Sequence, residues 1–235
     1  MPPKTFVLVH GAWHGGWCWR RVADLLAAQG HRVFAPTLTG LGERSHFMSA
    51  SIKLATHIAD VVNVITWERL TNVVLVGHSY GGFVISGAAE RAQSAIGAIV
   101  FLDAFVPENG QCLLELTAPA TREIIEAARE RGSLTVPPRP AEFFKVNEAD
   151  RAWVDAMCTP HPIATLTDKV ALSGVRERIA NKVYVRANAY PNPGFDAAYA
   201  KIKSNPAWRV YDLPCGHDMM IDMPERLTEI LLEVV

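Results

Sequence analysis

The sequence lacks an excess of charge of either sign. Lys and Arg number 23 against 24 Asp and Glu in 235 residues, which gives a formal net charge of −1. Without a basic stripe the chain has little to neutralise a row of phosphates, so composition argues against nucleic acid or an anionic membrane as main partner. No apolar run approaches the roughly 20 residues of a membrane-spanning helix. We therefore expect a pocket that binds a small molecule.

Cysteine is also scarce. The four residues of this type, Cys18, Cys112, Cys158 and Cys215, are widely separated and form no CxxC pair. This spacing fits neither a disulfide framework nor a zinc cage, so we expect reduced thiols and no bound metal. The first residues lead directly into a short apolar strand pattern and contain no signal-peptide core. Together these features predict a cytoplasmic protein.

Short apolar runs rich in β-branched residues alternate with amphipathic stretches of helical length. This alternation is typical of an α/β fold, in which helices cover both faces of a mostly parallel sheet. We expect a single domain over residues 1–235, because one core of this size is the default for such a length. The predicted strands span residues 5–9, 31–34, 73–76, 99–102, 182–185 and 208–211, and the predicted helices about 17–29, 54–67, 81–91 and 224–232.

The alternation breaks between about residues 107 and 175. No strand pattern is evident in this segment, and prolines cluster at positions 137, 138 and 140. Helical patterns at about 121–131 and 148–158 indicate a small helical cap over the carboxyl ends of the strands rather than a second domain.

Residues 77–82 read Gly-His-Ser-Tyr-Gly-Gly and match G-x-S-x-G between an apolar strand and a helix of small residues. In this setting the minimal side chains of Gly77 and Gly81 allow a sharp turn that exposes the Ser79 hydroxyl at the helix N-terminus. A plain glycine turn is the alternative interpretation. We predict that Ser79 is a nucleophile.

A serine hydroxyl needs a base to take its proton. His217 follows the last predicted strand, in a loop that can bring its imidazole over Ser79. The other histidines do not fit the chain order of serine, acid and histidine. We therefore predict that His217 is the base, and we interpret the neighbouring Asp218 as structural.

The first predicted strand leads into a glycine-containing loop at residues 10–16. The Ala12 N–H and the Tyr80 N–H could face the negative oxygen that develops during acyl transfer, each contributing about 3–4 kcal/mol. A phosphate loop is the alternative, but neither G-x-G-x-x-G nor a Walker lysine is present. An apolar, partly aromatic pocket is expected. Its candidate lining residues are Trp13, Tyr80, Phe105, Trp153 and Met157, although a Trp or Met on a cap helix equally serves core packing.

These motifs together resemble the α/β-hydrolase superfamily, and within it the branch of plant methylesterases and hydroxynitrile lyases with small bacterial relatives. The resemblance spans nearly the whole chain and is carried by residues 6–12, 17–19, 76–82 and 216–218. It implies an α/β-hydrolase fold. It also implies a serine hydrolase with Ser79 as nucleophile, His217 as base, and Ala12 and Tyr80 as oxyanion donors.

The acid of the triad departs from the family pattern. The family usually carries it in a stretch resembling residues 183–190, where this chain has no carboxylate and has Tyr190 at the expected position. Asp103 and Asp196 both keep the required chain order. We favour Asp103, because a carboxylate that closes an apolar strand is costly to bury without a partner, and His217 would supply one. A capping role is the alternative for Asp103.

The leading hypothesis is hydrolysis of a small carboxylic ester through an acyl-enzyme on Ser79, with no cofactor. A lyase resembling hydroxynitrile lyases is the second hypothesis, but those enzymes carry a lysine directly after the base, where this chain has Asp218. A non-catalytic ligand-binding protein on the same fold is the third. The sequence leaves open the acyl and alcohol groups, a lactone, thioester or amide as substrate, and a homodimer.

Overall fold

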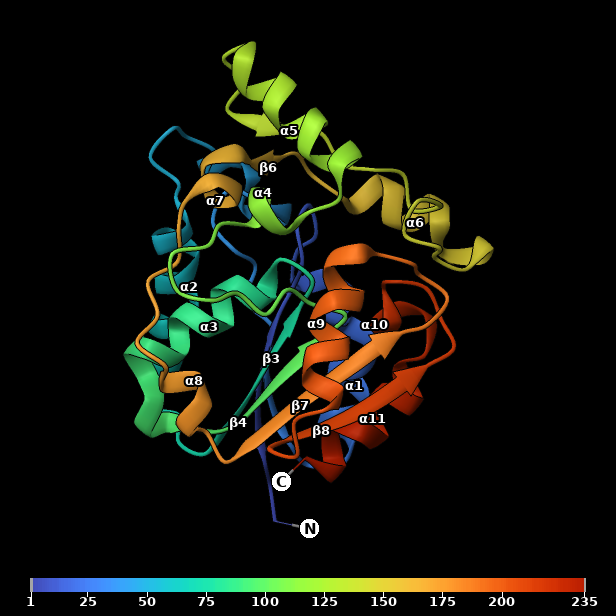
Figure 1. Ribbon diagram of the computed structural model, residues 1–235. Coiled ribbons are helices and arrows are strands. Elements are labelled where there is room, and N and C mark those ends of the chain that lie inside the picture. Colours follow the sequence, from blue (N-terminus) through green and yellow to red (C-terminus); the bar gives the residue numbers. More distant parts are fainter. Residues whose placement is uncertain (1, 235) are drawn as a thin grey trace.

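A computed structural model describes residues 2–234 and contains one sheet of six parallel strands (Figure 1). The strand order is β2-β1-β3-β4-β7-β8. The six predicted strands are confirmed, and four of them extend beyond the apolar runs because ladder pairing continues there. Their bounds are β1 (Thr5–Val9), β2 (Arg32–Phe34), β3 (Val73–His78), β4 (Ile96–Leu102), β7 (Asn181–Ala187) and β8 (Trp208–Leu213).

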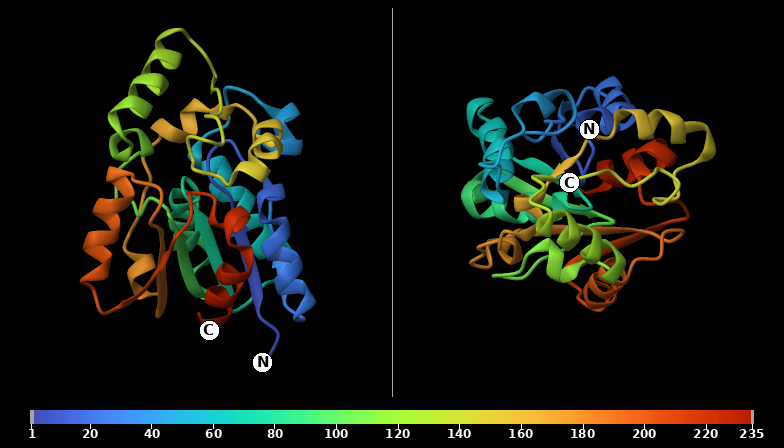
Figure 2. Two further views of the ribbon diagram at one scale, coloured as in Figure 1. Left: turned by 90° about the vertical axis from the view of Figure 1, so that its right-hand side faces the viewer. Right: turned by 90° about the horizontal axis from the view of Figure 1, so that it is seen from above.

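Helices cover both faces of this sheet (Figures 1 and 2). On one face α1 (Arg20–Ala28) contacts α11 (Pro224–Glu233), and on the other α2 (Leu54–Trp67) packs on α3 (Gly81–Ala92). Right-handed crossovers explain this division, since the chain moves one way from β1 to β2 and the opposite way from β2 to β3. None of the helices within residues 2–234 is long and apolar enough to cross a bilayer.

The strand order creates a switch point between β1 and β3. From these two neighbours the chain continues in opposite directions along the sheet. In open α/β sheets the crevice at the carboxyl ends of such strands is where ligands bind. The loop after β1 and the turn after β3 therefore meet at one place, and these are the segments that contain residues 10–16 and Ser79.

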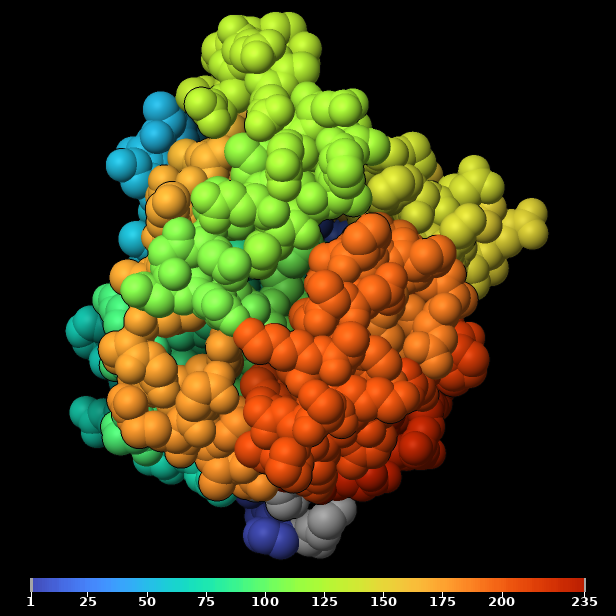
Figure 3. Space-filling view, viewed as in Figure 1, coloured from blue at the N-terminus to red at the C-terminus, as the bar shows by residue number. Residues whose placement is uncertain are grey.

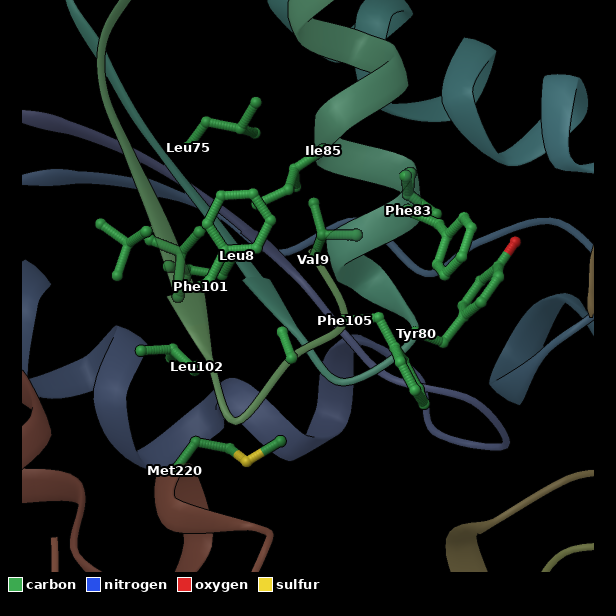
Figure 4. Packing of buried hydrophobic residues seen from close by; sticks show 14 of the residues in the cluster. Leu8, Val9, Leu75, Tyr80, Phe83, Ile85, Phe101, Leu102, Phe105 and Met220 are labelled. Carbon is green, nitrogen blue, oxygen red and sulfur yellow. The ribbon is translucent and has the colours of Figure 1, made fainter. Parts of the chain in front are cut away.

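The core consists of apolar side chains on both faces of the sheet (Figure 4). Every residue of β3 is buried, as expected for a central strand covered on both sides. Leu8, Leu75 and Phe101 have no exposed surface, and each such side chain contributes about 1.5–3 kcal/mol by leaving water. This packing fixes the strand ends from which the functional loops leave.

The longest helix that sequence analysis misses is α9 (Pro193–Lys203). It lies between β7 and β8, where no helix is predicted. The Asn192 side chain accepts hydrogen bonds from the N–H groups of Gly194 and Phe195, and Pro193 occupies the first turn. An Asn followed by Pro is a typical helix start, so this capping signal could have located α9.

Between β4 and β7 the chain forms the predicted cap, which lies over the carboxyl ends of the strands (Figure 1). Both predicted helices are present, as α5 (Pro119–Glu130) and α6 (Glu148–Met157). The expectation of no strand here is wrong, because β5 (Thr135–Val136) pairs antiparallel with β6 (His161–Pro162). Two-residue strands are too short to show alternation. The remaining short elements are η1 (Gly16–Trp19), η2 (Gly42–Phe47), η3 (Gln93–Ala95), α4 (Leu113–Leu116), α7 (Ile163–Thr167), α8 (Val175–Arg178) and α10 (Met219–Asp222).

Candidate active site

The turn between β3 and α3 holds Ser79 in a strained conformation. Its φ is 54°, in the left-handed region that residues with a Cβ rarely adopt. The Ser79 carbonyl accepts hydrogen bonds from the N–H groups of Gly82 (3.1 Å) and Phe105 (3.2 Å). A Cβ on Gly81 would lie 2.8 Å from the Val9 carbonyl oxygen, so the close approach of the turn to β1 requires glycine. This is the geometry in which a serine hydroxyl is presented at a helix N-terminus.

His217 lies in the loop after β8 and pairs with a buried carboxylate. Its Nδ1 is 2.6 Å from Oδ2 of Asp103, which has no exposed surface at the end of β4. A carboxylate only accepts, so Nδ1 carries the proton and Nε2 keeps a free lone pair. His217 and Ser79 line the same cavity. Within residues 2–234 no hydrogen bond yet joins them, as is common in ligand-free sites, where such contacts tighten on substrate binding.

The second candidate acid has a different partner. Asp196 lies on α9 with its side chain 56% exposed, and its Oδ1 accepts a hydrogen bond of 2.6 Å from Arg186. The structure therefore brings Asp103, and not Asp196, into contact with His217.

Arg186 is a site residue that sequence analysis missed. It lies near the end of β7 and is only 3% exposed. Its guanidinium donates hydrogen bonds to Oδ1 of Asp103 and to two backbone carbonyls, those of Ala187 and Tyr190, each at 2.7 Å. Burial would lower the pKa of Arg186, but the carboxylates of Asp103 and Asp196 outweigh it and raise the pKa. The Asp103 carboxylate thus bridges a guanidinium and the His217 imidazole. A lone arginine inside an apolar strand was the available signal.

Replacing Arg186 with methionine should lower the free energy of unfolding by about 3–5 kcal/mol, because it leaves Asp103 as a buried charge without its cationic partner. Urea denaturation checks this result. Arg131→Met, at an exposed arginine, is the matched control and should change stability by less than about 0.5 kcal/mol. An Arg186→Met variant as stable as the control would contradict a stabilising role for this contact.

The loop after β1 supplies the first candidate oxyanion donor. Trp13 has a φ of 67°, so the loop turns sharply directly after Ala12. Among residues 2–234 neither the Ala12 N–H nor the Tyr80 N–H donates a hydrogen bond. Both residues line the cavity that contains Ser79. If Ser79 acts as a nucleophile, a developing oxyanion requires two unsatisfied donors of this kind beside it.

The cavity is narrow and lies between the cap and the carboxyl end of the sheet, with about 40 Å³ of space for the centres of water-sized molecules. Figure 3 shows a hollow there, between the yellow-green cap and the orange segment that includes α9. Seven of its 17 lining residues are Phe, Tyr or Trp, and the predicted lining residues Trp13, Tyr80 and Phe105 are among them. The full lining comprises Ala12, Trp13, Ser79, Tyr80, Phe105, Leu113, Thr117, Thr121, Ile125, Arg139, Phe143, Phe144, Leu166, Tyr190, Asn192, Phe195 and His217.

Comparison with known proteins identifies the family of this chain. Residues 6–230 match the family described as "Alpha/beta hydrolase family". The chain belongs to this family. It is 43% identical, over 97% of its own length and 98% of the other chain, to a carbendazim hydrolyzing esterase from Nocardioides sp. (strain SG-4G). Methylesterase 7 of Arabidopsis thaliana is 25% identical over 98% of this chain and 96% of that protein.

Two further relatives and one solved structure are also similar to this chain. The chain spans 56% of the length of two further Arabidopsis thaliana relatives. An extracellular alpha/beta-hydrolase from a Paenibacillus species superimposes with a TM-score of 0.86 over 99% of both chains, at 24% identity, which supports the fold alone. The predicted α/β-hydrolase fold, the family and a carboxylesterase-like hydrolase are thereby confirmed.

Two predicted lining residues of this hydrolase are not in the cavity. Trp153 packs edge-to-face on Trp17, with ring centroids 5.1 Å apart, and Met157 is 38% exposed. An ion pair of 2.6 Å between Arg21 and Asp150 joins α1 to α6. The prediction for Trp153 and Met157 is wrong because α6 packs toward η1 and α1 and not over Ser79.

Next to His217 lies a second buried cluster. Asp218 has no exposed surface, and its carboxylate is 3.1 Å from Nε2 of His14 and 3.7 Å from Nε2 of His78. Burial would raise the pKa of Asp218, but His14 and His78 outweigh it and hold the pKa well below its ordinary value. His78, His217 and Asp218 lie close enough to share an ion. However, His78 Nε2 already bonds the His217 carbonyl (3.0 Å) and His217 Nδ1 bonds Asp103, so we assign no metal here.

Proposed function

We propose that this hydrolase cleaves small carboxylic esters, with methyl esters and carbamates of planar aromatic groups as its substrate class, through an acyl-enzyme on Ser79. The observation that carries the proposal is the buried pair of His217 and Asp103 at the cavity that Ser79 lines. Sequence similarity supports the same substrate class, since the relative with 43% identity is named for hydrolysing carbendazim, a methyl carbamate on a planar benzimidazole.

The proposed reaction begins when Ser79 Oγ attacks the carbonyl carbon and its proton passes to Nε2 of His217. The carbonyl π electrons move to oxygen, and the N–H groups of Ala12 and Tyr80 bind the resulting oxyanion. When the oxyanion collapses, the bond to the alkoxide breaks and the leaving oxygen takes the proton from Nε2. Asp103 stays ionised and stabilises the imidazolium. Water then attacks the acyl group with the same base, releasing the acid and free Ser79.

Two other functions are less well supported. A cyanohydrin lyase would need a positive charge to hold departing cyanide, whereas the residue after the base is the buried carboxylate of Asp218. A ligand-binding protein without catalysis would have no need for a histidine paired with a buried carboxylate beside Ser79. The partner we propose is thus the small-molecule ester itself, and composition continues to argue against nucleic acid and membranes. We also propose a cytoplasmic location, because the four cysteines are scattered and form no disulfide within residues 2–234.

Hydrolysis of carbendazim beside 4-nitrophenyl acetate tests the proposal. We expect turnover of both compounds. Carbendazim should lose methanol and give a carbamic acid, which loses CO2 to form the 2-aminobenzimidazole that is measured, and the acetate should release 4-nitrophenolate. Turnover of the acetate alone would restrict the proposal to simple esters. Turnover of neither by folded protein would contradict ester hydrolysis.

Phe143→Ala should lower kcat/KM for the aromatic carbamate about 3- to 10-fold, because Phe143 lines the cavity and an aromatic pair contributes about 0.5–1.5 kcal/mol beyond area burial. The kcat/KM for 4-nitrophenyl acetate serves as the internal reference, because its acyl group is smaller and should depend less on Phe143. Phe47→Ala, at a phenylalanine that is 54% exposed and outside the cavity, is the matched control. Equal losses in both variants would contradict an aromatic acyl site.

A further inference from the structure

The peptide unit that carries the Ala12 N–H is held from behind by a histidine. Its carbonyl, that of Gly11, accepts a hydrogen bond of 2.8 Å from Nδ1 of His10. Nε2 of His10 accepts from the Leu38 N–H at 3.0 Å, so the proton of the neutral ring must be on Nδ1. Burial lowers the pKa of His10 to about 3, which keeps the ring in this neutral form. With its carbonyl bound inside the protein, this peptide unit presents its N–H on the opposite side.

The next peptide unit is held at both ends. The Ala12 carbonyl accepts a hydrogen bond of 2.8 Å from Nδ1 of His14. The Trp13 N–H donates to Nδ1 of His161 at 3.2 Å, and Nε2 of His161 donates to Thr165 Oγ1 at 2.8 Å. Thr165 in turn donates to a backbone carbonyl, which fixes the direction of this chain of hydrogen bonds. Both histidines are buried, and neither lines the cavity.

His14 also carries a charge that joins two loops of the site. Its Nδ1 faces the Ala12 carbonyl and its Nε2 faces the Asp218 carboxylate, and since both partners only accept, both nitrogens are protonated. Burial would lower the pKa of His14, but Asp218 outweighs it and the pKa is raised. Asp218 directly follows the base, so this ion pair links the loop of the oxyanion donor to the loop of His217.

We propose that His10, His14 and His161 are positioning residues that aim the Ala12 N–H at the oxyanion. The backbone dihedrals of Ala12 are set by the planes of the two peptide units beside it, and the three histidines hold both planes. A donor that is fixed before reaction stabilises the oxyanion without the cost of reorientation. The loop also needs such support because the positive φ of Trp13 is unfavourable for a residue with a Cβ. This inference rests on the proposed serine mechanism.

The test compares a ligand that can form an oxyanion with a closely related ligand that cannot. Ser79 Oγ can add to the carbonyl carbon of 2,2,2-trifluoroacetophenone, passing its proton to His217 and leaving a negative hemiketal oxygen. The alcohol 2,2,2-trifluoro-1-phenylethanol has the same phenyl and trifluoromethyl groups but no carbonyl, so it cannot form a hemiketal. Inhibition constants for the ketone and the alcohol are measured with wild type and with four variants. These are His10→Leu with its partner His10→Asn, and His161→Leu with its partner His161→Asn. Asparagine retains a polar amide group near the position of Nδ1, and leucine removes it.

We expect both leucine variants to bind the ketone about 10- to 100-fold more weakly. The upper end of this range equals the smallest loss, about 100-fold, that removing a whole oxyanion donor causes. In the leucine variants the affinity for the alcohol and the KM for ester should stay unchanged, and kcat should fall by the same factor as the affinity for the ketone. Each asparagine variant should recover most of the loss. His46→Leu, at an exposed histidine outside the loop, is the control and should alter neither inhibitor.

Folded leucine variants that keep full ketone affinity, or lose ketone and alcohol affinity equally, would overturn the positioning role. Wild type that hydrolyses no ester and binds the ketone no better than the alcohol would instead refute the serine mechanism, and the positioning role with it. The two failures are therefore distinguished by the behaviour of the wild type.

Discussion

Ser79→Ala should lower kcat for 4-nitrophenyl acetate by about 10⁶-fold, the loss typical of removing the nucleophile from a serine triad. The expected effect is this large because neither His217 nor the oxyanion donors can form the acyl-enzyme without the hydroxyl. Residual hydrolysis would come from water attacking a substrate bound at the oxyanion donors. Steady-state kinetics over a wide range of enzyme concentration measures both rates.

A second serine on the following helix provides the control for Ser79. Ser86 is buried on α3, and its hydroxyl donates to the Gly82 carbonyl at 2.7 Å, away from the cavity lining. Ser86→Ala should keep kcat within about 3-fold of wild type, since this hydroxyl only bonds its own helix. Loss of activity in Ser86→Ala comparable to that in Ser79→Ala would indicate a general disturbance of α3 and contradict the role given to Ser79.

Asp103→Asn should lower kcat by about 10⁴-fold, as expected when the acid of a serine triad becomes an amide. The amide cannot stabilise the His217 imidazolium, and it can hold the ring in the wrong tautomer. Asp196→Asn should lower kcat by less than about 3-fold, because this side chain is 56% exposed and bonds Arg186 rather than His217. The same kinetic assay applied to both variants gives the ranking.

The reverse ranking would assign the acid to Asp196 and refute the pairing of Asp103 with His217. Equal and small effects would mean that His217 acts without a carboxylate. Urea denaturation of both variants separates lost chemistry from lost folding, since Asp103 also bonds the buried Arg186.

Much of the fold follows from local patterns. The buried strand β3 begins with an uninterrupted apolar run at residues 73–76, so its position and type could be predicted from sequence. The pair of β5 and β6 could not be predicted, because a strand of two residues shows no periodicity. The helix α9 was missed because its apolar positions are weak, and only the start at Asn192 and Pro193 marks it.

The site divides in a similar way. The sharp turn at Ser79 could be predicted because a turn of this kind needs glycines at fixed spacing within a few residues. Asp103 could be proposed from the cost of burying a carboxylate at a strand end. Arg186 and the histidines behind Ala12 act through contacts between segments far apart in the chain, such as His161 with Trp13. No spacing rule encodes such contacts, and they become visible only when the loops are folded together.

The most direct test of the central claim is the intact mass of the protein after reaction with a fluorophosphonate, with the modified peptide then sequenced. An activated Ser79 predicts one adduct per wild-type chain, located on residue 79, no adduct on Ser79→Ala, and much slower labelling of Asp103→Asn. Absence of an adduct on folded wild type, or an adduct that persists in Ser79→Ala, would contradict a nucleophilic role for Ser79.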